Sequence, residues 1–395
     1  MEKEKSLMSR SVNRRSLLKT GALAGGAVAL GAGLAGTATS AFAQESKSRV
    51  TKGDIAILTF LSALEQVEAD LWIQYAELGG ATNQPTSSRI DLPFATGLAP
   101  AYITGLLVLD GDMPQYIADN TDDEISHHRF LNNYLQSKGA KPVDLSSHAT
   151  LPPSEVKGVP QNGRLTNLKQ LTIDTSWWTR YRSATKNPDL GGKFENAVPD
   201  LAKGQHPAIP VDNDDLDLDP ITGKISNHLQ AIANTAGFHF AFIEQGGSSL
   251  YPSLATKVTD LEVLRVLLSI GGSEIMHFQT WHDKAGNVAL ISDGSLTFPD
   301  LNSAVDPNNG KTGTDVADSF QTNLIMPEPT VFLDPKLEPV SIIRPTSTAQ
   351  GGAVASVVSF AEDGLFLDPA TGKNTGIVDV LMRLAEEADE AQRRF

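Results

Sequence analysis

The sequence predicts a mainly α-helical protein built around a four-helix bundle. Four separate stretches repeat apolar residues every three to four positions, which is the period of a helix with one buried face. Two of these stretches contain a Glu-x-x-His pair, Glu124 with His127 and Glu274 with His277. Residues three apart share a helix face, so each pair sets a carboxylate beside an imidazole. Two such pairs, with one glutamate from each of two further helices, are the ligand set of a dinuclear metal site inside a bundle.

Composition places the 395-residue chain among globular proteins and excludes several functions. Apolar residues make up 40% of the chain and charged residues 20%, which is typical of a protein with a packed core. The net charge of −15 argues against a nucleic-acid partner, because there is no basic stripe to neutralise phosphates. The chain has no cysteine, so disulfides, thiolate zinc sites, iron–sulfur clusters and cysteine nucleophiles are excluded. Asp, Glu and His remain as the plausible metal ligands.

The first 43 residues are predicted to be an export signal. Arg14 and Arg15 lie in a segment that resembles a twin-arginine motif, a short Ala/Gly-rich run follows, and residues 41–43 form a small-x-small cleavage site. A transmembrane anchor is the alternative, but the run is short and rich in glycine. The signal predicts export of a folded protein to the periplasm or the extracellular space, with no membrane span after cleavage.

The bundle is predicted to span residues 52–284. Its first helix is Asp54–Leu78, where apolar residues recur at helical spacing until two glycines end the pattern. The second helix is Met113–Gln136, and its inner face carries Glu124 and His127.

Residues 140–224 are predicted to be a long irregular insertion between the second and third helices. They are rich in Pro, Gly, Asn and Asp, and 85 residues is far longer than an ordinary bundle connection. Within the β-like or helical segment Leu165–Arg182, Trp177 and Trp178 are expected to pack the insertion onto the bundle. The acidic run Asp212–Asp219 suggests calcium, but it lacks the glycine and the distal glutamate of an EF-hand loop. An exposed acidic turn is therefore favoured.

The third and fourth helices are predicted at about Ile225–Gln245 and Asp260–Lys284. Gly246 and Gly247 are expected to end or kink the third helix, since glycine disfavours a helix interior. The fourth helix carries the second Glu-x-x-His pair in the middle of its apolar face.

Residues 285–395 are predicted to be a mixed, loop-rich C-terminal extension. Short strand-like or irregular pieces, such as Val331–Leu333 and Val354–Phe360, replace the helical period. A final amphipathic helix, Ile377–Arg394, closes the chain.

The glutamate that the first helix contributes is open between two positions. Glu65 and Glu244 are each followed by Gln and, seven residues on, by an aromatic residue, so the internal match favours Glu65. At 100° per residue, Glu68 lies nearer the centre of the apolar face and Glu65 lies at its edge. Both are retained as candidates, with Glu68 slightly ahead.

The chemistry of these residues predicts a di-iron or di-manganese centre. Buried ionisable side chains are costly unless a partner compensates them. Carboxylates that bridge two divalent metal ions about 4 Å apart offset the charge of the ions, and histidine is a neutral ligand suited to iron or manganese. We expect bridging carboxylates from Glu124 and Glu274, and terminal ligands from Glu68 or Glu65, Glu244, His127 and His277.

Three other residues are candidates for the surroundings of this centre. His239 lies on the inner face of the third helix and is a core or access-channel histidine. Tyr75 and Tyr251 are expected to be core residues rather than redox tyrosines.

Four segments carry a resemblance to a known family. They are Thr59–Trp72, Tyr116–Asn120 leading into the first Glu-x-x-His pair, Phe240–Gln245, and the second Glu-x-x-His pair. They resemble the ferritin-like proteins of the desiccation-related and stress-associated group. The resemblance covers roughly Lys52–Lys284. It implies a ferritin-like four-helix bundle and a dimetal site more firmly than it implies any reaction.

Two functions follow as hypotheses. The first is an exported dimetal oxidoreductase that acts on a small-molecule oxidant, either oxygen or a peroxide, because a redox-cycling metal pair can exchange two electrons without a protein nucleophile. The second is a non-catalytic stress or desiccation protein that keeps the bundle as a scaffold. A homo-oligomer is compatible with both, but the insertion and the C-terminal extension would obstruct a 24-subunit storage cage.

Overall fold

The computed structural model describes residues 50–82, 92, 94–180, 193–301 and 352–394. This part of the chain is mainly helical, as predicted. Internal contacts divide the chain into two units, Met1–Arg49 and Val50–Phe395. The first unit, which contains the predicted export signal, lies outside the described residues, and so does Val331–Leu333. Among the described helices, none is both long and apolar enough to cross a membrane.

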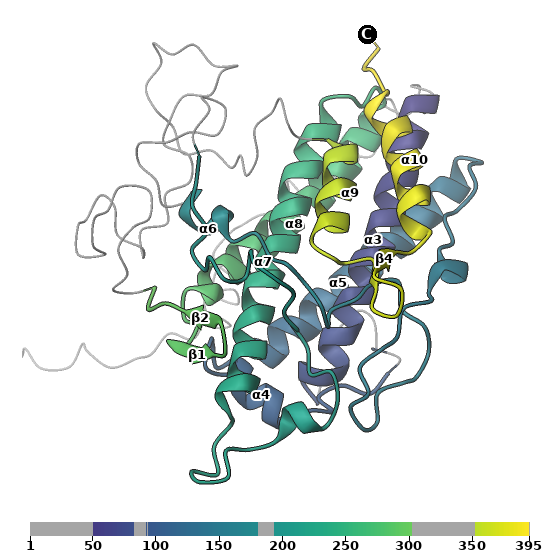
Figure 1. Ribbon diagram of the computed structural model, residues 1–395. Coiled ribbons are helices and arrows are strands. Elements are labelled where there is room, and N and C mark those ends of the chain that lie inside the picture. The colour runs from purple at the N-terminus through teal and green to yellow at the C-terminus, as the bar shows by residue number, and fades with distance from the viewer. Residues whose placement is uncertain (1–49, 83–91, 93, 181–192, 302–351, 395) are drawn as a thin grey trace, which may run out of the picture. The chain divides into compact units, whose positions relative to one another are not determined.

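Figure 1 shows the arrangement of the elements. The longest helices in the described ranges are α3 (Lys52–Gly79), α5 (Met113–Ser137), α7 (Asn227–Ala255) and α8 (Leu261–Ala285). The shorter helices are α4 (Pro100–Leu106), η1 (Ser146–His148), α6 (Ser176–Arg180), η3 (Asp214–Leu216), α9 (Ala353–Glu362) and α10 (Ile377–Asp389). Two small antiparallel sheets pair β1 (Ile291–Asp293) with β2 (Leu296–Phe298) and β3 (Leu367–Asp368) with β4 (Lys373–Asn374).

Side-chain caps mark the starts of α3, α7 and α8. At the start of α3 the Thr51 hydroxyl accepts a hydrogen bond from Asp54 N (3.1 Å), and the Asp54 carboxylate accepts one from Thr51 N (2.8 Å). This reciprocal capping satisfies two backbone donors that lack partners within the helix. Ser226 and Asp260 cap α7 and α8 in the simpler way, through one side-chain oxygen each.

The helix pair α3 and α5 runs antiparallel, and so does the pair α7 and α8. Ser62 donates to Asn132 (3.0 Å), whereas Thr121 donates to the Trp72 carbonyl (3.1 Å), so the start of α3 lies beside the end of α5. Two hydrogen bonds from α7, one to α8 and one to the residues that follow α8, show that α7 and α8 also run in opposite directions. They join Ser248 to Glu274 O (3.3 Å) and Asn234 to Ala289 O (2.9 Å).

The two pairs join so that α5 and α7 point in the same direction. Trp281 of α8 donates to Asn120 near the start of α5 (2.8 Å), and Lys138 at the end of α5 pairs with Glu262 near the start of α8 (2.6 Å). Since α8 is antiparallel to both α5 and α7, the chain must return along the helices between them. The segment 140–224 makes this return, but a direct crossover needs only about a dozen residues, so the return alone does not account for its length.

The insertion packs onto the helices through its two tryptophans, as predicted. Trp177 and Trp178 are buried, and the ring of Trp177 lies 5.8 Å from that of Phe238 in α7 and 6.1 Å from that of Phe278 in α8. A buried ion pair between Arg164 and Glu77 (2.6 Å) ties the insertion to α3.

The acidic run of the insertion forms a largely exposed turn. Asp219 accepts hydrogen bonds from Ile221 N (3.0 Å) and Thr222 N (2.7 Å), and Asp215 pairs with His228 (3.1 Å). In the described part of the chain, the acidic and histidine groups that could hold a metal include none of these aspartates.

Two local predictions were wrong. Gly246 and Gly247 do not end the third long helix, because α7 continues to Ala255. The segment Val354–Phe360 is not strand-like but lies in helix α9. Its buried residues Ala353, Val357 and Phe360 follow a helical spacing, and the ring of Phe360 packs against that of Phe242 in α7 (6.3 Å). Burial against α10 and α7 outweighs the β propensity of the valines.

Candidate metal centre

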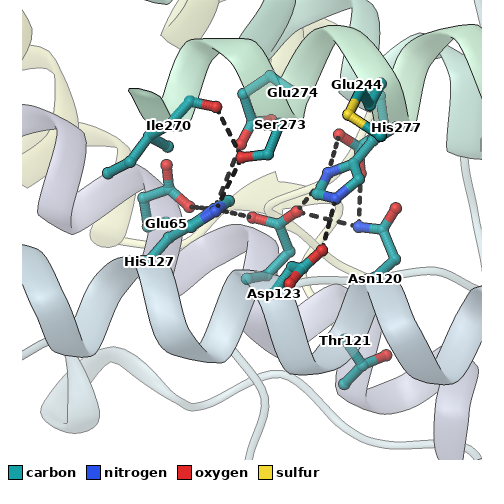
Figure 2. A network of polar contacts seen from close by, with 12 residues as sticks. Glu65, Asn120, Thr121, Asp123, His127, Glu244, Ile270, Ser273, Glu274 and His277 are labelled. Atoms are coloured by element: carbon teal, nitrogen blue, oxygen red, sulfur yellow. Dashed lines mark hydrogen bonds and ion pairs between the residues drawn. The ribbon is translucent and has the colours of Figure 1, made fainter. Parts of the chain in front are cut away.

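Six of the candidate ligands meet where α3, α5, α7 and α8 converge. Figure 2 labels Glu65, His127, Glu244, Glu274 and His277 among them. They form two groups, within each of which one ligand atom per residue lies within 4.8 Å of all the others. The first group is Glu65, Glu124, His127 and Glu274, and the second is Glu124, Glu244, Glu274 and His277. Each group contains one Glu and one His of its own, and the two groups share Glu124 and Glu274.

The carboxylate of Glu124 connects the two groups. Its Oε2 lies 3.1 Å from His127 Nδ1, and its Oε1 lies 3.0 Å from His277 Nδ1. Each oxygen therefore faces a different group, as a bridging carboxylate requires. Both histidines turn Nδ1 inward, and their rings stack at 6.2 Å between centroids.

Several buried ligand atoms of this centre have no hydrogen-bond partner. They are Glu65 Oε2, both carboxylate oxygens of Glu274, and His277 Nδ1. Glu65 Oε2 and Glu274 Oε1 each lie 3.3 Å from His127 Nδ1, and His277 Nδ1 lies 3.3 Å from Glu244 Oε2, but none of these contacts is aligned as a hydrogen bond. Buried polar atoms without partners are costly. Bound cations would satisfy them all.

The charge of the centre suits two divalent cations. Glu124 and Glu274 are fully buried, and Glu65 and Glu244 are at most 2% exposed. These four carboxylates with two neutral imidazoles carry a charge of −4, which two divalent ions would cancel. Burying four carboxylates together without such compensation would be strongly unfavourable.

Burial and the charges of neighbouring side chains shift the pKa values of the candidate ligands. Burial raises the pKa of Glu65 to about 7 and raises the pKa of Glu244. It also raises the pKa of Glu274 well above its usual range. Burial acts on Glu124 in the same sense, but His127 and His277 outweigh it and hold the pKa of Glu124 well below its usual range. The acidic neighbours of both histidines raise the pKa of the imidazoles against the effect of burial.

The outer nitrogens of the two histidines have different partners. His277 Nε2 lies 3.1 Å from Asp123 Oδ2, whereas His127 Nε2 lies 3.1 Å from Ser273 Oγ (Figure 2). Ser273 donates its own hydrogen to Ile270 O (2.8 Å), so its oxygen accepts from His127. A hydrogen bond on the outer nitrogen fixes the ring and leaves Nδ1 free to bind a metal. The carboxylate partner makes His277 the more basic ligand.

Asn120 also hydrogen-bonds to the candidate ligands, a role that the sequence analysis did not predict for it. Its Nδ2 donates to Glu124 Oε1 (3.0 Å) and to Glu244 Oε1 (2.9 Å), and its Oδ1 accepts from Trp281 Nε1 (2.8 Å). The spacing of four residues from Glu124 is the signal that could have indicated it, because residues four apart share a helix face.

Of the two candidates on α3, Glu65 lies in a ligand group and Glu68 lies in neither. Glu65 Oε1 accepts a hydrogen bond from the hydroxyl of Tyr251, which leaves Oε2 facing His127. Glu68 is buried nearby, and its Oε1 has no hydrogen-bond partner. Burial and the neighbouring carboxylates raise the pKa of Glu68 well above its usual range. Glu68 is therefore a buried carboxyl beside the centre that belongs to neither ligand group.

Gly247 in α7 leaves the space that the carboxylate of Glu274 occupies. A Cβ at position 247 would lie 2.5 Å from Glu274 Oε2 and 3.1 Å from its Cδ. Gly271 in α8 likewise leaves space for the side chain of Tyr251 in α7, since a Cβ at position 271 would lie 2.7 Å from the Cβ of Tyr251. These glycines let α7 and α8 approach closely, which explains why glycine occurs inside a helix here.

Replacing Gly247 by alanine is expected to weaken metal binding while the protein stays folded. The new methyl group can be accommodated by rotating the flexible Glu274 side chain, which moves a shared carboxylate out of both groups. The matched control is Gly272→Ala, because a Cβ at this exposed helical position meets nothing within 4 Å. That control should stabilise the protein by about 0.5–1 kcal/mol and keep its metal. Thermal denaturation and metal titration of both variants test this, and equal metal affinities would contradict the role of Gly247.

Comparisons with protein-family models, with curated proteins and with solved structures found no match to this chain. The assignment of the centre therefore depends on its own geometry and chemistry.

Proposed function

We propose that α3, α5, α7 and α8 form a ferritin-like four-helix bundle that holds two divalent iron or manganese ions. We further propose that the protein is exported and acts on oxygen or a peroxide under oxidative stress. The observation that carries this proposal is the pair of buried ligand groups that share Glu124 and Glu274.

The direction of the helices supports the bundle assignment. Two antiparallel pairs are joined by one long crossover between α5 and α7, and a single long crossover is typical of ferritin-like bundles. The ligands also follow the pattern of such sites, with one Glu from each of α3 and α7 and one Glu-x-x-His pair from each of α5 and α8.

The donor set supports iron or manganese. Carboxylate oxygens outnumber imidazole nitrogens, and the chain has no thiolate. This combination suits Fe²⁺ and Mn²⁺ better than softer ions. When bound, such a metal pair would exchange electrons with oxygen or a peroxide.

The residues of the chain position the ligands and control access to them. Asp123 and Ser273 orient the histidines from outside, and Asn120 orients Glu124 and Glu244. His127 and His277 are the most exposed ligands, at 9% each, while the side chain of Asp123 is 30% exposed. A small oxidant would therefore reach the centre between α5 and α8, and the rest of the centre excludes water.

The test is the metal content of the full chain folded in a metal-replete cytoplasm. We expect about two iron or manganese ions per chain and a change in absorption when hydrogen peroxide is added. Elemental analysis gives the first quantity and a stopped-flow spectrum the second. Less than a tenth of an equivalent of either metal would contradict the proposal. A loaded protein that leaves peroxide unchanged would contradict only the redox activity.

Asp123→Asn is expected to weaken the binding of one metal ion more than that of the other. The amide cannot accept the His277 proton as strongly as a carboxylate, and loss of such an outer partner typically costs about 10- to 100-fold in metal affinity. Calorimetric titration should show one weakened and one nearly unchanged step. Ser273→Ala is the matched change on the His127 side, and it should affect the opposite step.

A further inference from the structure

A continuous group of buried aromatic rings lies next to the ligands of the centre. It is here called the aromatic relay. It consists of Trp281 in α8, Trp72 and Tyr75 in α3, and His239 in α7. All four are at most 1% exposed. Nothing in the proposed metal chemistry requires these residues.

Each step of the relay is a close contact. Asn120 hydrogen-bonds to Glu124 and Glu244 and accepts from Trp281 Nε1 (2.8 Å). The ring of Trp281 stacks on that of Trp72 at 5.2 Å between centroids, and Trp72 lies 5.7 Å from Tyr75. Phe240 packs against all three rings at 4.6–5.0 Å and fills the space between them.

The relay ends in a phenol that is hydrogen-bonded to an imidazole. The Tyr75 hydroxyl lies 2.7 Å from His239 Nδ1, and both residues are buried. Burial lowers the pKa of His239 to about 3 and raises the pKa of Tyr75 well above its usual range. At neutral pH the imidazole is therefore neutral, and its Nδ1 accepts the hydrogen bond of the phenol.

The composition of the relay exceeds what packing alone requires. Trp72 Nε1 is buried without a hydrogen-bond partner, which costs free energy that phenylalanine would not cost. Tryptophan and tyrosine are the side chains most readily oxidised by one electron among those that fill apolar cores, and phenylalanine is not oxidised in this way. Their uninterrupted sequence from the ligands to a proton acceptor suits electron transfer.

We propose that Tyr75 and His239 form a redox-active pair that supplies one electron to the metal centre through Trp72 and Trp281. The proposal rests on the proposed function. A hydroperoxide needs two electrons and two protons to give water and an alcohol, or two waters from hydrogen peroxide. Tyr75 would provide one of these electrons, and a bound metal pair with one divalent ion would supply the other.

The proton and the charge are accounted for in this step. The phenolic proton of Tyr75 moves to His239 Nδ1, which leaves a neutral tyrosyl radical and an imidazolium. The two protons that the peroxide consumes come from solvent. The radical stays in a buried part of the core, away from the ligands.

The experiment uses the full chain loaded with ferrous iron. One equivalent of ferricyanide leaves one ferrous ion per pair, hydrogen peroxide is added, and frozen samples are examined by electron paramagnetic resonance. We expect a radical signal that narrows when ring-deuterated tyrosine is incorporated. The signal should vanish in Tyr75→Phe and form more slowly in Trp72→Phe.

Tyr102→Phe is the matched control. Tyr102 is an equally buried tyrosine, but its hydroxyl donates to the Ala208 carbonyl (2.8 Å), which cannot take up the proton. This variant should keep the signal. Hyperfine coupling to ¹⁵N-labelled histidine in the wild-type protein tests the pair without any substitution.

The outcomes separate the relay from the metal chemistry. A protein that binds iron and consumes peroxide without a tyrosyl radical would overturn the relay and leave the proposed function intact. A radical that persists in Tyr75→Phe, is lost in Tyr102→Phe, or shows no coupling to histidine nitrogen would also overturn it. A chain that binds no iron would overturn both proposals.

Discussion

Replacing Glu124 by glutamine is expected to remove both metal ions from the protein. Each carboxylate oxygen of Glu124 faces one histidine, at 3.1 and 3.0 Å, so this residue serves both ligand groups. An amide supplies only one good oxygen ligand and no negative charge. Loss of a hydrogen-bond partner outside the ligands reduces metal affinity by about 10- to 100-fold. Loss of the Glu124 carboxylate should reduce it by more. Elemental analysis of the purified variant measures it directly.

Two matched substitutions define the specificity of this result. Glu244→Gln affects only the second ligand group, so about one metal ion per chain should remain. Glu68→Gln changes a buried carboxyl that belongs to neither group, and this variant should keep both ions. If Glu68→Gln loses metal as Glu124→Gln does, Glu68 is a ligand and the assignment to Glu65 is wrong.

Folding controls accompany these three variants. Glutamine is close to glutamate in shape, and it removes like-charge repulsion from a crowded buried site. The metal-free forms of Glu68→Gln and Glu244→Gln should therefore melt at or above the temperature of the metal-free wild type. Glu124→Gln loses the attraction between this carboxylate and the two histidines, so its metal-free form should melt at a lower temperature but still in one cooperative transition. A variant without a cooperative transition would mean that metal loss reflects unfolding rather than loss of a ligand.

The second large effect expected is a pH dependence that differs in direction between metal-free and metal-loaded protein. The metal-free protein should lose stability as the pH rises from about 4.5 to 7. Over this range the unfolded carboxyl of Glu65 has lost its proton, whereas the folded one keeps it, because its pKa is raised to about 7. The folded state then binds more protons, and stability falls as they are removed.

The other groups of the centre contribute with the same sign above pH 4.5. The pKa values of Glu244 and Glu274 are raised by burial, and those of His127 and His277 are raised by the carboxylates around them. For Glu65 alone, a shift of this size corresponds to a loss on the order of 3 kcal/mol. Glu124 has the opposite sign, because its pKa is lowered from 4.5. Its stabilisation changes mainly below about pH 4.5 and is present above it.

Metal ions should reverse this trend. Bound cations take the place of the protons, and metal affinity rises with pH as the ligands deprotonate. Saturation at about 1,000 times the dissociation constant adds about 4 kcal/mol per site. Thermal denaturation from pH 5 to 8, with chelator or with saturating metal, measures both curves. A metal-free protein that becomes more stable from pH 5 to 7 would show that these carboxylates are not buried together.

The choice between Glu65 and Glu68 illustrates the limit of sequence reasoning. The 100° wheel places Glu68 nearer the centre of the apolar face of α3, and Glu68 is indeed buried. A ligand, however, must face the other ligands and not only the core. The structure groups Glu65 with His127, and the hydrogen bond from Tyr251 in α7 orients it. That contact joins residues far apart in the chain, so no helical wheel contains it.

The glycines of α7 show a second limit. Local helix propensity predicts that these glycines end the helix, because glycine loses more backbone entropy in a helix interior than other residues do. In the folded protein a larger residue at position 247 would meet the Glu274 carboxylate, and the helix continues to Ala255. Close packing of α8 on α7, rather than local chain preference, explains the glycine.

The sequence by itself determined the mainly helical class, the four helical stretches and the residue types of the centre. These features depend on spacing within single helices, which can be recognised in the sequence because the α-helix repeats every 3.6 residues. Only the tertiary structure decided which carboxylate of α3 faces the ligands, why α7 carries Gly247, and how Trp281, Trp72 and Tyr75 connect the centre to His239. These features depend on contacts between different helices, which arise only when the packing of the folded chain brings distant residues together.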